Sequence, residues 1–410
     1  MKREAVQRAT DGARIGIEAY LWSKAGSYRQ SGVSAYIRYL VLGLSAVPLP
    51  GQGLVYLPSS APLADLPAAS PLQVRIGPPL LLHPAARILW EHSLFPLLLR
   101  RDRVNLLHAT MNVAPWWSPC PVVVTIHDLA YLRYPQVHPL GRRLYLTAFT
   151  RLTIRRARAI VTVSQYTRLE VERFFRVPGQ RIHVIYEGHD DRFRPLPREQ
   201  IELFREQKGL PPRYLLYVGN LEPRKNLSRL VQAYARTGRP GRVPLVLAGP
   251  PGWGCASLFH LIDTLGLSGQ VIFPGFVAAE ELPLWYNGAE AFIYPSLYEG
   301  FGLPPLEAMA CGTPVLVSTA SSLPEVVGDA GLQVAPDDVD GMTEAIQRLL
   351  DDSDLRVSLR QRGLERARRF SWERMARETA SLYGQLLDGQ DEGSPAPAGI
   401  RDGRVARPPR

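Results

Sequence analysis

The most informative segment of the sequence is Ala291-Phe-Ile-Tyr-Pro-Ser-Leu-Tyr-Glu-Gly-Phe-Gly-Leu-Pro-Pro-Leu-Glu-Ala-Met-Ala310, followed by Cys311-Gly-Thr-Pro-Val-Leu-Val-Ser318. Its apolar runs, separated by glycine and proline, predict a short buried strand, a loop, a short helix and a second strand. Pro304 and Pro305 suit a first helical turn, where N–H groups have no partner within the helix. Gly312 suits the position just after the helix end.

Two carboxylates, Glu299 and Glu307, flank the loop of this stretch. Gly300 and Gly302 let the backbone approach a ligand at a helix N-terminus, where anions are favoured. This layout predicts a nucleotide site. Because carboxylates repel phosphate, we expect both glutamates to accept hydrogen bonds from ribose and sugar hydroxyls. The alternative is that Glu307 only complements the helix dipole and Glu299 is a solvated loop residue, and the spacing leaves both open.

A chain of 410 residues with 46% hydrophobic and 21% charged residues is expected to form two or three soluble globular domains. The widely spaced Cys120, Cys255 and Cys311 form neither a disulfide framework nor a metal-binding pattern. They fit a reduced, cytoplasmic protein. Residues 1–16 lack the apolar segment of a secretion signal, and no apolar run is long enough to span a bilayer.

Basic charge is concentrated in residues 1–185, which hold 23 of the 48 Lys and Arg but 9 of the 38 Asp and Glu. This asymmetry argues against nucleic-acid binding over the whole surface, and it permits peripheral contact with an anionic membrane. A general bias toward arginine explains it equally well. The basic helix expected at 140–157 could lie on a membrane, although its apolar residues more often face a core: Leu144, Leu146, Phe149, Leu152 and Ile154.

Two series of alternating strands and helices predict an α/β protein with two doubly wound parallel sheets. The first series has strands expected at 14–20, 104–108, 121–126, 159–163 and 181–186. The second has strands expected at 214–219, 243–249, 271–273, 291–294 and 314–317. Helices are expected at 33–44, 85–103, 140–157, 164–175, 343–351, 355–369 and 372–387. Ser31 is the expected cap of the first of these helices, and Pro96 should break the second.

The domains are expected to divide at a polar, proline-rich segment. Residues 1–186 would form the first domain, residues 187–213 a linker and residues 214–371 the second domain. Residues 389–410, rich in Gly, Pro, Ala and Arg, would form a disordered tail. Two such domains side by side imply a ligand in the cleft between them.

A cationic motif, Gly219-Asn-Leu-Glu-Pro-Arg-Lys-Asn226, directly follows a predicted strand. Gly219 permits a tight turn, and Arg224 and Lys225 could stabilise a diphosphate leaving group. A solvated cationic helix start is the alternative. Because cations are unfavourable at a helix N-terminus, a basic pair there favours an anionic ligand.

The pair His127-Asp128 follows another strand, and we favour a substrate contact over an acid/base dyad, with a loop histidine as the alternative. Gly249-Pro-Pro-Gly-Trp-Gly254 lacks the Gly-Lys-Ser/Thr of a phosphate-binding loop. No GxGxxG follows the first strand, and no metal-ligand cluster or serine nucleophile elbow is present in the sequence. NTPase and NAD-dehydrogenase functions are therefore disfavoured.

Together these motifs resemble the retaining glycosyltransferases of family 4, which have the GT-B fold. Residues 299–307 resemble the family's E-x7-E motif, and residues 219–226 its donor-diphosphate loop, although many members have arginine where this chain has Asn220. Further matches are Thr125-Ile-His-Asp128, Val161-Thr-Val-Ser164, Ser322-Leu-Pro-Glu-Val-Val-Gly-Asp-Ala-Gly331 and Phe370-Ser-Trp372. The resemblance covers nearly the whole chain.

The resemblance implies a role for each matching residue. Glu307 would bind the ribose hydroxyls and Glu299 the hydroxyls of the transferred sugar. Arg224 and Lys225 would neutralise the diphosphate, and His127 would lie beside the reacting sugar. The remaining donor-binding positions would be the backbone N–H groups of Phe301, Gly302 and Leu303, the diphosphate loop at Gly219 and Asn220, the base-binding region at Gly275 and Val277, and Gly32 near the phosphates.

The resemblance also implies two Rossmann-like domains facing across a cleft, with the last helix, 372–388, packed back on an acceptor-binding first domain. The expected reaction moves a hexose, with mannose favoured over glucose or GlcNAc, from a nucleotide-diphosphate sugar such as GDP-mannose. The acceptor would be a glycan or a polyprenyl-linked lipid in cell-surface polysaccharide synthesis, possible at the inner face of the plasma membrane. No metal, other cofactor or protein nucleophile would be needed. A nucleotide-sugar epimerase and a non-catalytic nucleotide-sugar-binding subunit are the alternatives.

Overall fold

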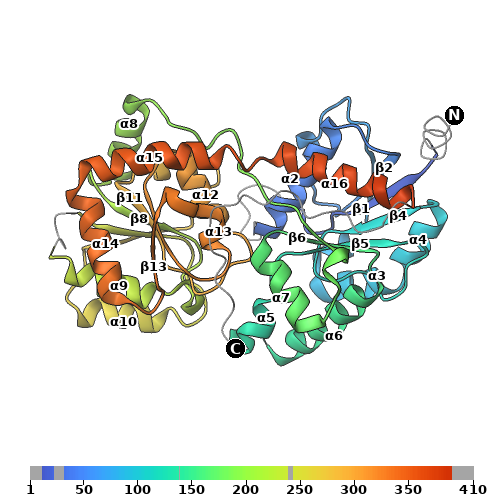
Figure 1. Cartoon of the computed structure of the whole chain (residues 1–410), viewed down its shortest axis with the longest axis horizontal. Coiled ribbons are helices and arrows are strands. Elements are labelled where there is room, and N and C mark those ends of the chain that lie inside the picture. The colour runs from blue at the N-terminus through green and yellow to red at the C-terminus, as the bar shows by residue number, and fades with distance from the viewer. Residues whose placement is uncertain (1–11, 23–31, 138, 239–242, 390–410) are drawn as a thin grey trace. The chain divides into compact units, whose positions relative to one another are not determined.

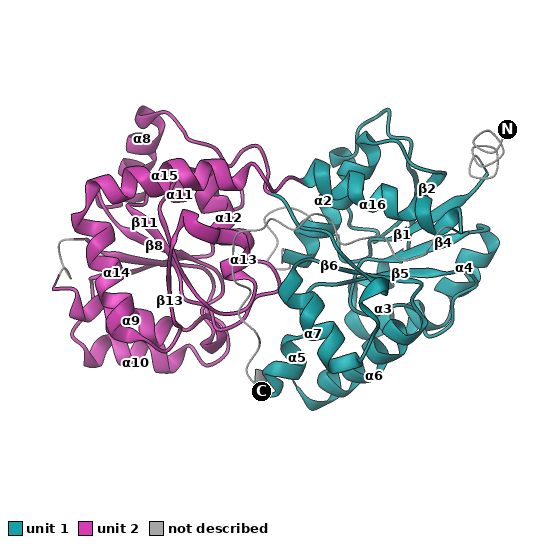
Figure 2. Cartoon of the chain, viewed as in Figure 1, with its two compact units in different colours: residues 1–188, 372–399 teal, residues 189–371, 400–410 magenta. Residues whose placement is uncertain are grey.

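The computed structural model describes residues 12–22, 32–137, 139–238 and 243–389 (Figure 1). The expected cap at Ser31 and the expected tail at 390–410 lie outside the described residues. The chain divides into two compact units (Figure 2). Unit 1 contains the described residues up to Gly188 and those from Trp372 onward, and unit 2 contains His189–Ser371.

Unit 1 is built on a seven-stranded parallel sheet with the order β3-β2-β1-β4-β5-β6-β7. Its strands are β1 (Arg14–Glu18), β2 (Gln52–Leu57), β3 (Gln73–Ile76), β4 (Leu106–Ala109), β5 (Val122–Ile126), β6 (Ala159–Thr162) and β7 (Ile182–Val184). All residues of β4, β5 and β6 are buried, as expected for central parallel strands with helices on both faces. The partly exposed edge strand β3 has no such apolar run, and the sequence did not predict it.

The α-helices of unit 1 are α2 (Gly32–Ala46), α3 (Pro84–His92), α4 (Phe95–Arg101), α5 (Ala130–Arg133), α6 (Leu140–Arg156), α7 (Gln165–Phe175) and α16 (Trp372–Leu387). The predicted break near Pro96 is confirmed, because the helix restarts with this proline in its first turn. Ser164 caps α7 by accepting a hydrogen bond from the Thr167 N–H.

Helix α16 packs against α2 within unit 1, although it follows all of unit 2 in the sequence. The helices approach closely at Gly43, where a Cβ would lie 2.6 Å from the Cβ of Ala376. The Tyr39 and Trp372 rings stack at 4.7 Å. The chain therefore returns to unit 1 through specific side-chain packing.

Unit 2 is built on a six-stranded parallel sheet with the order β10-β9-β8-β11-β12-β13. Its strands are β8 (Leu215–Val218), β9 (Leu245–Ala248), β10 (Val271–Gly275), β11 (Ala291–Tyr294), β12 (Val315–Ser318) and β13 (Leu332–Val334). Its α-helices are α8 (Arg198–Lys208), α9 (Leu227–Arg236), α10 (Ala256–Thr264), α11 (Leu282–Gly288), α12 (Leu303–Ala310), α13 (Leu323–Val327), α14 (Val339–Asp351) and α15 (Ser353–Ala367).

Helices cover both faces of this sheet: α9, α10 and α14 pack together on one side, and α8, α11, α12 and α15 on the other (Figure 1). The prediction of two parallel doubly wound sheets is thus confirmed. The segment 187–213 differs from the expected linker, because it contains α8, and residues from His189 onward belong to unit 2. Phe204 anchors α8 by packing edge-on against the Trp285 ring. Within the described residues, no helix is long and apolar enough to cross a membrane.

Candidate functional site

The carboxyl ends of β8 and β11 bring the two predicted motifs of unit 2 together. These strands are neighbours, and the strand order reverses there, since β9 follows β8 in the chain but lies on its other side. Such a switch point is where open α/β sheets bind ligands. The Leu297 N–H donates to the Arg224 carbonyl at 2.9 Å and joins the two loops. Sheet topology therefore makes neighbours of residues about 70 positions apart.

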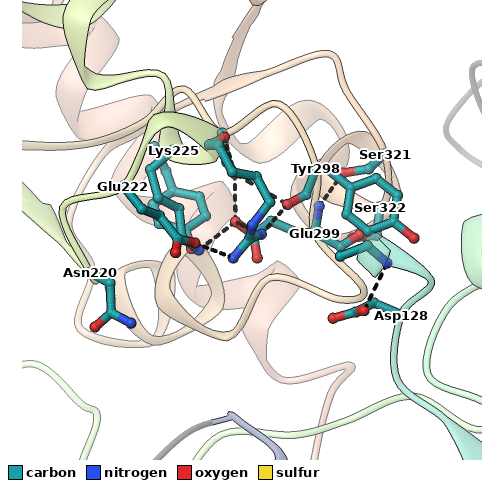
Figure 3. A network of polar contacts seen from close by, with 12 residues as sticks. Asp128, Asn220, Glu222, Lys225, Tyr298, Glu299, Ser321 and Ser322 are labelled. Atoms are coloured by element: carbon teal, nitrogen blue, oxygen red, sulfur yellow. Dashed lines mark hydrogen bonds and ion pairs between the residues drawn. The ribbon is translucent and has the colours of Figure 1, made fainter. Parts of the chain in front are cut away.

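Lys225 lies at the centre of this site, with 9% of its side chain exposed. Its Nζ donates to Glu299 Oε1 at 2.6 Å and to the Tyr294 hydroxyl at 2.7 Å (Figure 3). The same Nζ lies 5.1 Å from the centre of the Tyr294 ring. Burial lowers the pKa of Lys225, and the negative charge of Glu299 acts against that effect. A solvated helix start, the alternative for this lysine, is excluded.

Glu299 is held as a carboxylate. Burial alone would raise its pKa, but the charges of Lys225 and Arg224, together with hydrogen bonds from Lys225 and Ser296, lower the pKa to about 2. The Ser296 hydroxyl donates to Oε1 at 2.5 Å, and Arg224 Nη1 lies 3.4 Å from the same oxygen. The hydrogen bonds from Lys225 and Ser296 both reach Oε1. A carboxylate held in this way can still accept hydrogen bonds from a ligand through its other oxygen.

The loop that carries the two cations is fixed by side chains that sequence reasoning missed. Arg224 pairs with Glu222 at 2.7 Å and donates to the Tyr298 carbonyl. Asn226, buried and in the left-handed region with φ +62°, donates to the carbonyls of Pro295 and Pro336. These contacts hold the turn before α9, and only the Asn226 residue type, which tolerates positive φ, signals them in the sequence.

Glu307, the second glutamate, lies in an opposite electrostatic environment on α12. Burial raises its pKa to about 7, and the hydrogen bond from the Tyr286 hydroxyl to Oε2, 2.9 Å long, opposes the rise. The nearby charge of Arg192 also lowers this pKa, whereas Asp190 raises it. The two glutamates therefore differ by several pH units in acidity, so the site holds one permanent carboxylate and one that titrates near neutrality.

The glycine loop between the glutamates leads directly into α12. Gly302 has φ +120°, a backbone conformation that residues with a side chain rarely adopt, and a Cβ there would lie 2.9 Å from Leu323 Cδ2. The buried Ser322 hydroxyl donates to the Phe301 and Glu299 carbonyls at 2.5 and 3.1 Å. Ser321 accepts from the Glu299 N–H at 2.9 Å. The backbone at the predicted residues Phe301, Gly302 and Leu303 is thus held at the start of the helix.

The remaining predicted donor residues of unit 2 follow β8 and β10. Gly219 has φ +146°, and Gly249 must also lack a side chain, because its Cβ would lie 2.0 Å from the Gly219 carbonyl oxygen. Asn220 is exposed, and Figure 3 shows its side chain apart from the charged network. Gly275 has φ +76° at the end of β10, and Val277 lines a cavity of about 290 Å³. All four thus lie near the carboxyl edge of the sheet.

Two predicted residues, Gly32 and His127, belong to unit 1. Gly32 is the exposed first residue of α2. The buried His127 contacts the Thr110 carbonyl through Nε2 at 2.9 Å, and its Nδ1 lies 3.6 Å from Glu187 Oε1. Its ring packs edge-on against Tyr36 at 4.7 Å.

The acidic partner of this histidine was missed, because Glu187 stood in the expected linker. Burial raises the pKa of Glu187, and His127 opposes the rise. Asp128 instead accepts a hydrogen bond from the Ala130 N–H at 3.0 Å. The structure thus pairs His127 with a different carboxylate from its sequence neighbour. Among the residues the structure describes, no cluster of three or more His, Cys, Asp or Glu could hold a metal ion.

Two family models match this chain. One is described as "Glycosyl transferases group 1" and covers residues 199–366, and the other is "Glycosyltransferase Family 4" and covers residues 30–193. Together they span the site residues of both units.

Mannosyltransferases are among the relatives. The chain is 39% identical over 267 residues to O-antigen chain mannosyltransferase B of Escherichia coli. These residues cover 64% of this chain and 70% of that protein. It is 34% identical over 286 residues to MMP alpha-(1->4)-mannosyltransferase of Mycolicibacterium hassiacum, 65% of this chain and 66% of that one. Serotype-specific mannosyltransferase WbdA of Escherichia coli is 32% identical over 289 residues, and this chain covers about a third of its length (68% of this chain and 34% of that protein).

Solved structures share the fold. Sucrose-phosphate synthase from Thermosynechococcus elongatus matches with a TM-score of 0.72 and 23% identity over 92% of this chain and 100% of that one. Anabaena HepE in complex with UDP and glucose matches with a TM-score of 0.71 and 20% identity over 91% and 100%. At this identity the likeness shows the architecture of two Rossmann-like domains, the GT-B fold, and nothing about ligands.

Proposed function

Because this chain belongs to the group 1 glycosyltransferases, we propose that it transfers mannose from GDP-mannose to a glycan or polyprenyl-linked acceptor, with retention of the anomeric configuration. The proposal favours mannose because three of the relatives named above are mannosyltransferases by name. Synthesis of a cell-surface polysaccharide fits the O-antigen relative. Unit 1 would bind the acceptor and unit 2 the donor.

The buried network of Lys225, Arg224 and Glu299 carries this proposal. Glu299 stays ionised near neutral pH, and the hydrogen bonds from Lys225 and Ser296 both reach its Oε1. An ionised acceptor of this kind suits sugar hydroxyls, which donate hydrogen bonds. Lys225 and Arg224, held beside it, would balance the charge of the donor's diphosphate. The site thus matches a sugar joined to a diphosphate, with both parts recognised a few ångströms apart.

Glu307 would bind the ribose hydroxyls of the donor. Two hydroxyl groups that donate to its oxygens would favour the ionised form and lower its pKa from about 7. Tyr286 already donates a hydrogen bond to Oε2, which restricts the orientation of the carboxylate. Donor binding is then expected to release a proton near neutral pH.

In the proposed reaction the bond between the anomeric carbon and the diphosphate oxygen breaks, and its electron pair stays with the nucleoside diphosphate. The acceptor hydroxyl oxygen forms the new bond on the same face, and its proton goes to a diphosphate oxygen. The chain's own contribution would be to position both substrates and to stabilise the negative charge that grows on the leaving group, through Lys225 and Arg224. A carboxylate with a pKa of about 2 is a poor proton acceptor, so Glu299 is assigned to binding.

The test combines donor binding with product analysis. GDP-mannose, UDP-glucose, UDP-GlcNAc and ADP-glucose are compared by thermal shift, and we expect GDP-mannose to stabilise the protein most. Lys225→Ala and Glu299→Ala should abolish transfer while the chain stays folded. Lys208→Ala is the matched control, because Lys208 forms an ion pair of similar length, 2.7 Å, with Glu281 on the surface.

Two results would overturn the proposal. A fully active Glu299→Ala variant would remove the role given to this carboxylate. Conversion of the donor sugar into an epimer in the absence of any acceptor would identify an epimerase instead of a transferase.

A further inference from the structure

The imidazole ring of His127 is held at both of its nitrogen atoms. His127 directly follows β5, at the edge of the sheet where open α/β proteins bind ligands. Nε2 lies 2.9 Å from the Thr110 carbonyl oxygen, which can only accept, so Nε2 carries a hydrogen. Nδ1 lies 3.6 Å from Glu187 Oε1. A protein group therefore faces each nitrogen of the ring, which fits a substrate contact and not a proton-transfer group.

One proton belongs to the pair of His127 and Glu187. The two residues are 8% and 4% exposed, so water competes little for either. If Nδ1 carries the proton, the two groups form an ion pair; if the carboxyl group carries it, the ring is neutral. In both states Nε2 keeps its hydrogen for the Thr110 carbonyl. Glu187 therefore favours one orientation of the ring and one position of its hydrogen.

The backbone of the same residue is clamped by one amide side chain. Asn112 Oδ1 accepts a hydrogen bond from the His127 N–H at 3.0 Å, and Asn112 Nδ2 donates to the Asp128 carbonyl at 2.8 Å. Asn112 lies in the segment that follows β4, the neighbour of β5 in the sheet. One side chain thus fixes two successive residues, so the ring of His127 extends from a rigid backbone.

A buried chain of polar side chains connects the ring to α16. The Tyr36 ring of α2 packs edge-on against the His127 ring, with the centroids 4.7 Å apart. The Tyr36 hydroxyl lies 3.0 Å from Thr125 Oγ1, and that oxygen lies 2.8 Å from His108 Nε2. His108 Nδ1 lies 2.5 Å from the Tyr383 hydroxyl of α16, which lies beside α2 in unit 1 (Figure 1). Together these fully buried residues form the His108 chain: Tyr36, Thr125, His108 and Tyr383.

His108 gives this chain a direction. Burial, with a smaller contribution from His127, lowers the pKa of His108 to about 3, so its ring is neutral near neutral pH. A neutral imidazole donates through one nitrogen and accepts through the other, and each hydroxyl of the chain can do both. All hydrogen bonds therefore point the same way along the chain, and loss of one member leaves a buried partner unpaired.

We propose that Glu187 and the His108 chain position His127 for contact with the sugar of the substrate in the transfer reaction. Each of these residues acts through His127 and not on the substrate itself. The proposal rests on the proposed function, because it takes His127 as a substrate contact. Positioning matters because a displacement of about 1 Å in a reacting complex can lower the rate about a hundredfold. The alternative is a buried core without a role in the reaction, which predicts effects on stability alone.

The first test exchanges Glu187. Glu187→Gln keeps a group that can donate to His127 Nδ1 and so keeps the neutral ring in its orientation, whereas Glu187→Leu does not. Rates are measured on the full chain with GDP-mannose as donor and methyl α-mannoside as acceptor, and the release of GDP is followed. We expect Glu187→Leu to lower kcat about tenfold, which corresponds to about 1.4 kcal/mol, and to change the donor KM less than about twofold. Glu187→Gln should keep most of the parent rate.

The second test needs no substrate. In a chain labelled with nitrogen-15 histidine, the NMR signals of the His127 ring are identified by their loss in His127→Gln, and their shifts report which nitrogen carries a hydrogen. Tyr383→Phe removes the far end of the His108 chain, and we expect it to shift or broaden these signals and to lower kcat about threefold. Tyr56→Phe is the matched control, because it removes another buried tyrosine hydroxyl of unit 1, which donates to Asp102 at 3.1 Å. This control should leave the His127 signals and kcat unchanged.

Coupling between distant members distinguishes a chain from independent contacts. Thr125→Val interrupts the His108 chain between Tyr36 and His108. In that background Tyr383→Phe should have no further effect on the His127 signals or on kcat. Additive effects of the two substitutions would refute transmission along the chain.

Two further results would overturn the proposal. One is unchanged His127 signals in both Glu187→Leu and Tyr383→Phe, and the other is an equal loss of kcat in Glu187→Gln and Glu187→Leu. Thermal shift with GDP-mannose, measured on the same preparations, separates this proposal from the proposed function. A parent chain that the donor does not stabilise contradicts the proposed function, whereas a stabilised parent chain with unchanged His127 signals in the variants contradicts the positioning role only.

Discussion

The two glutamates of the site should affect stability in opposite directions with pH. In Glu299 the pKa lies at about 2, below its ordinary value of 4.5, so ionisation stabilises the folded chain. A difference of about 2.5 pH units corresponds to about 3.4 kcal/mol at about 1.4 kcal/mol per unit. This side chain is 13% exposed, so solvent screening reduces the figure little. We therefore expect Glu299→Gln to cost about 3 kcal/mol at pH 7.

The pH dependence follows from the sign of the shift. A depressed pKa gives stability that is present above pH 4.5 and is lost as the pH falls toward 2. The cost of Glu299→Gln should therefore shrink to about 1.4 kcal/mol at pH 3. Glu307 behaves in the opposite way, because its raised pKa of about 7 makes ionisation unfavourable in the folded chain. Glu307→Gln should be more stable than the parent by about 3 kcal/mol at pH 8 and equal to it near pH 4.

Urea denaturation of the full chain, followed by circular dichroism between pH 3 and pH 8, measures these differences. In the parent chain, which is expected to bind the nucleotide, the transition that shifts on its addition identifies the unfolding of unit 2. A cost of Glu299→Gln that stays constant from pH 7 to pH 3 would refute the account of its ion pair. A destabilising Glu307→Gln at pH 8 would refute the account of burial at that position. Loss of donor binding in both variants is expected throughout.

Three further predictions concern the groups that position the site. Tyr294→Phe removes the hydroxyl that Lys225 contacts, and we expect the loss of about 1 to 3 kcal/mol of transition-state stabilisation, seen as a lower kcat/KM with the fold retained. Gly302→Ala should destabilise the chain in thermal unfolding and abolish nucleotide binding, since the residue has φ +120° and its Cβ would press on Leu323. The control is Gly141→Ala in the first turn of α6, where the added Cβ would meet no atom and should not destabilise the chain. Ser322→Ala leaves the Glu299 and Phe301 carbonyls without their buried hydrogen-bond donor, so it should lower the free energy of unfolding, measured with urea, by about 1 to 3 kcal/mol. A variant as stable as the parent would show that this serine does not hold the loop.

The fold could be predicted from the sequence because parallel strands and their helices leave local patterns. The continuous apolar runs predicted β5 and β6 to within a few residues of their observed bounds. The last helix, Trp372–Leu387, begins and ends at the predicted residues. The edge strand β3 and the short strand β13 were not predicted, because partial exposure removes the apolar run. Helix α8 was read as a linker because its surface is mostly charged and only Phe204 is buried.

The sequence indicates candidate residues for the site, and their roles stay predictions, but it does not indicate their contacts. Glycines at positions 219 and 302 and the glutamates at 299 and 307 follow from the need for close backbone approach and for hydroxyl acceptors. The sequence carries no sign that Lys225 is buried on Tyr294, or that His127 meets Glu187 and not Asp128. Both pairs join residues about 60 or more positions apart, which are brought together by the strand order alone.

The fold class can be predicted from the sequence, because turns, helix starts and apolar periods are local properties of the chain, and the family follows from the resemblance of its motifs. The acidities of the two glutamates depend on the tertiary structure. Both lie in one stretch of nine residues, yet one pKa is lowered to about 2 and the other raised to about 7. The two pKa values differ because the loop after β8 places Arg224 and Lys225 beside Glu299, whereas α11 places the neutral Tyr286 beside Glu307. Packing across the sheet therefore decides which charges lie next to each glutamate.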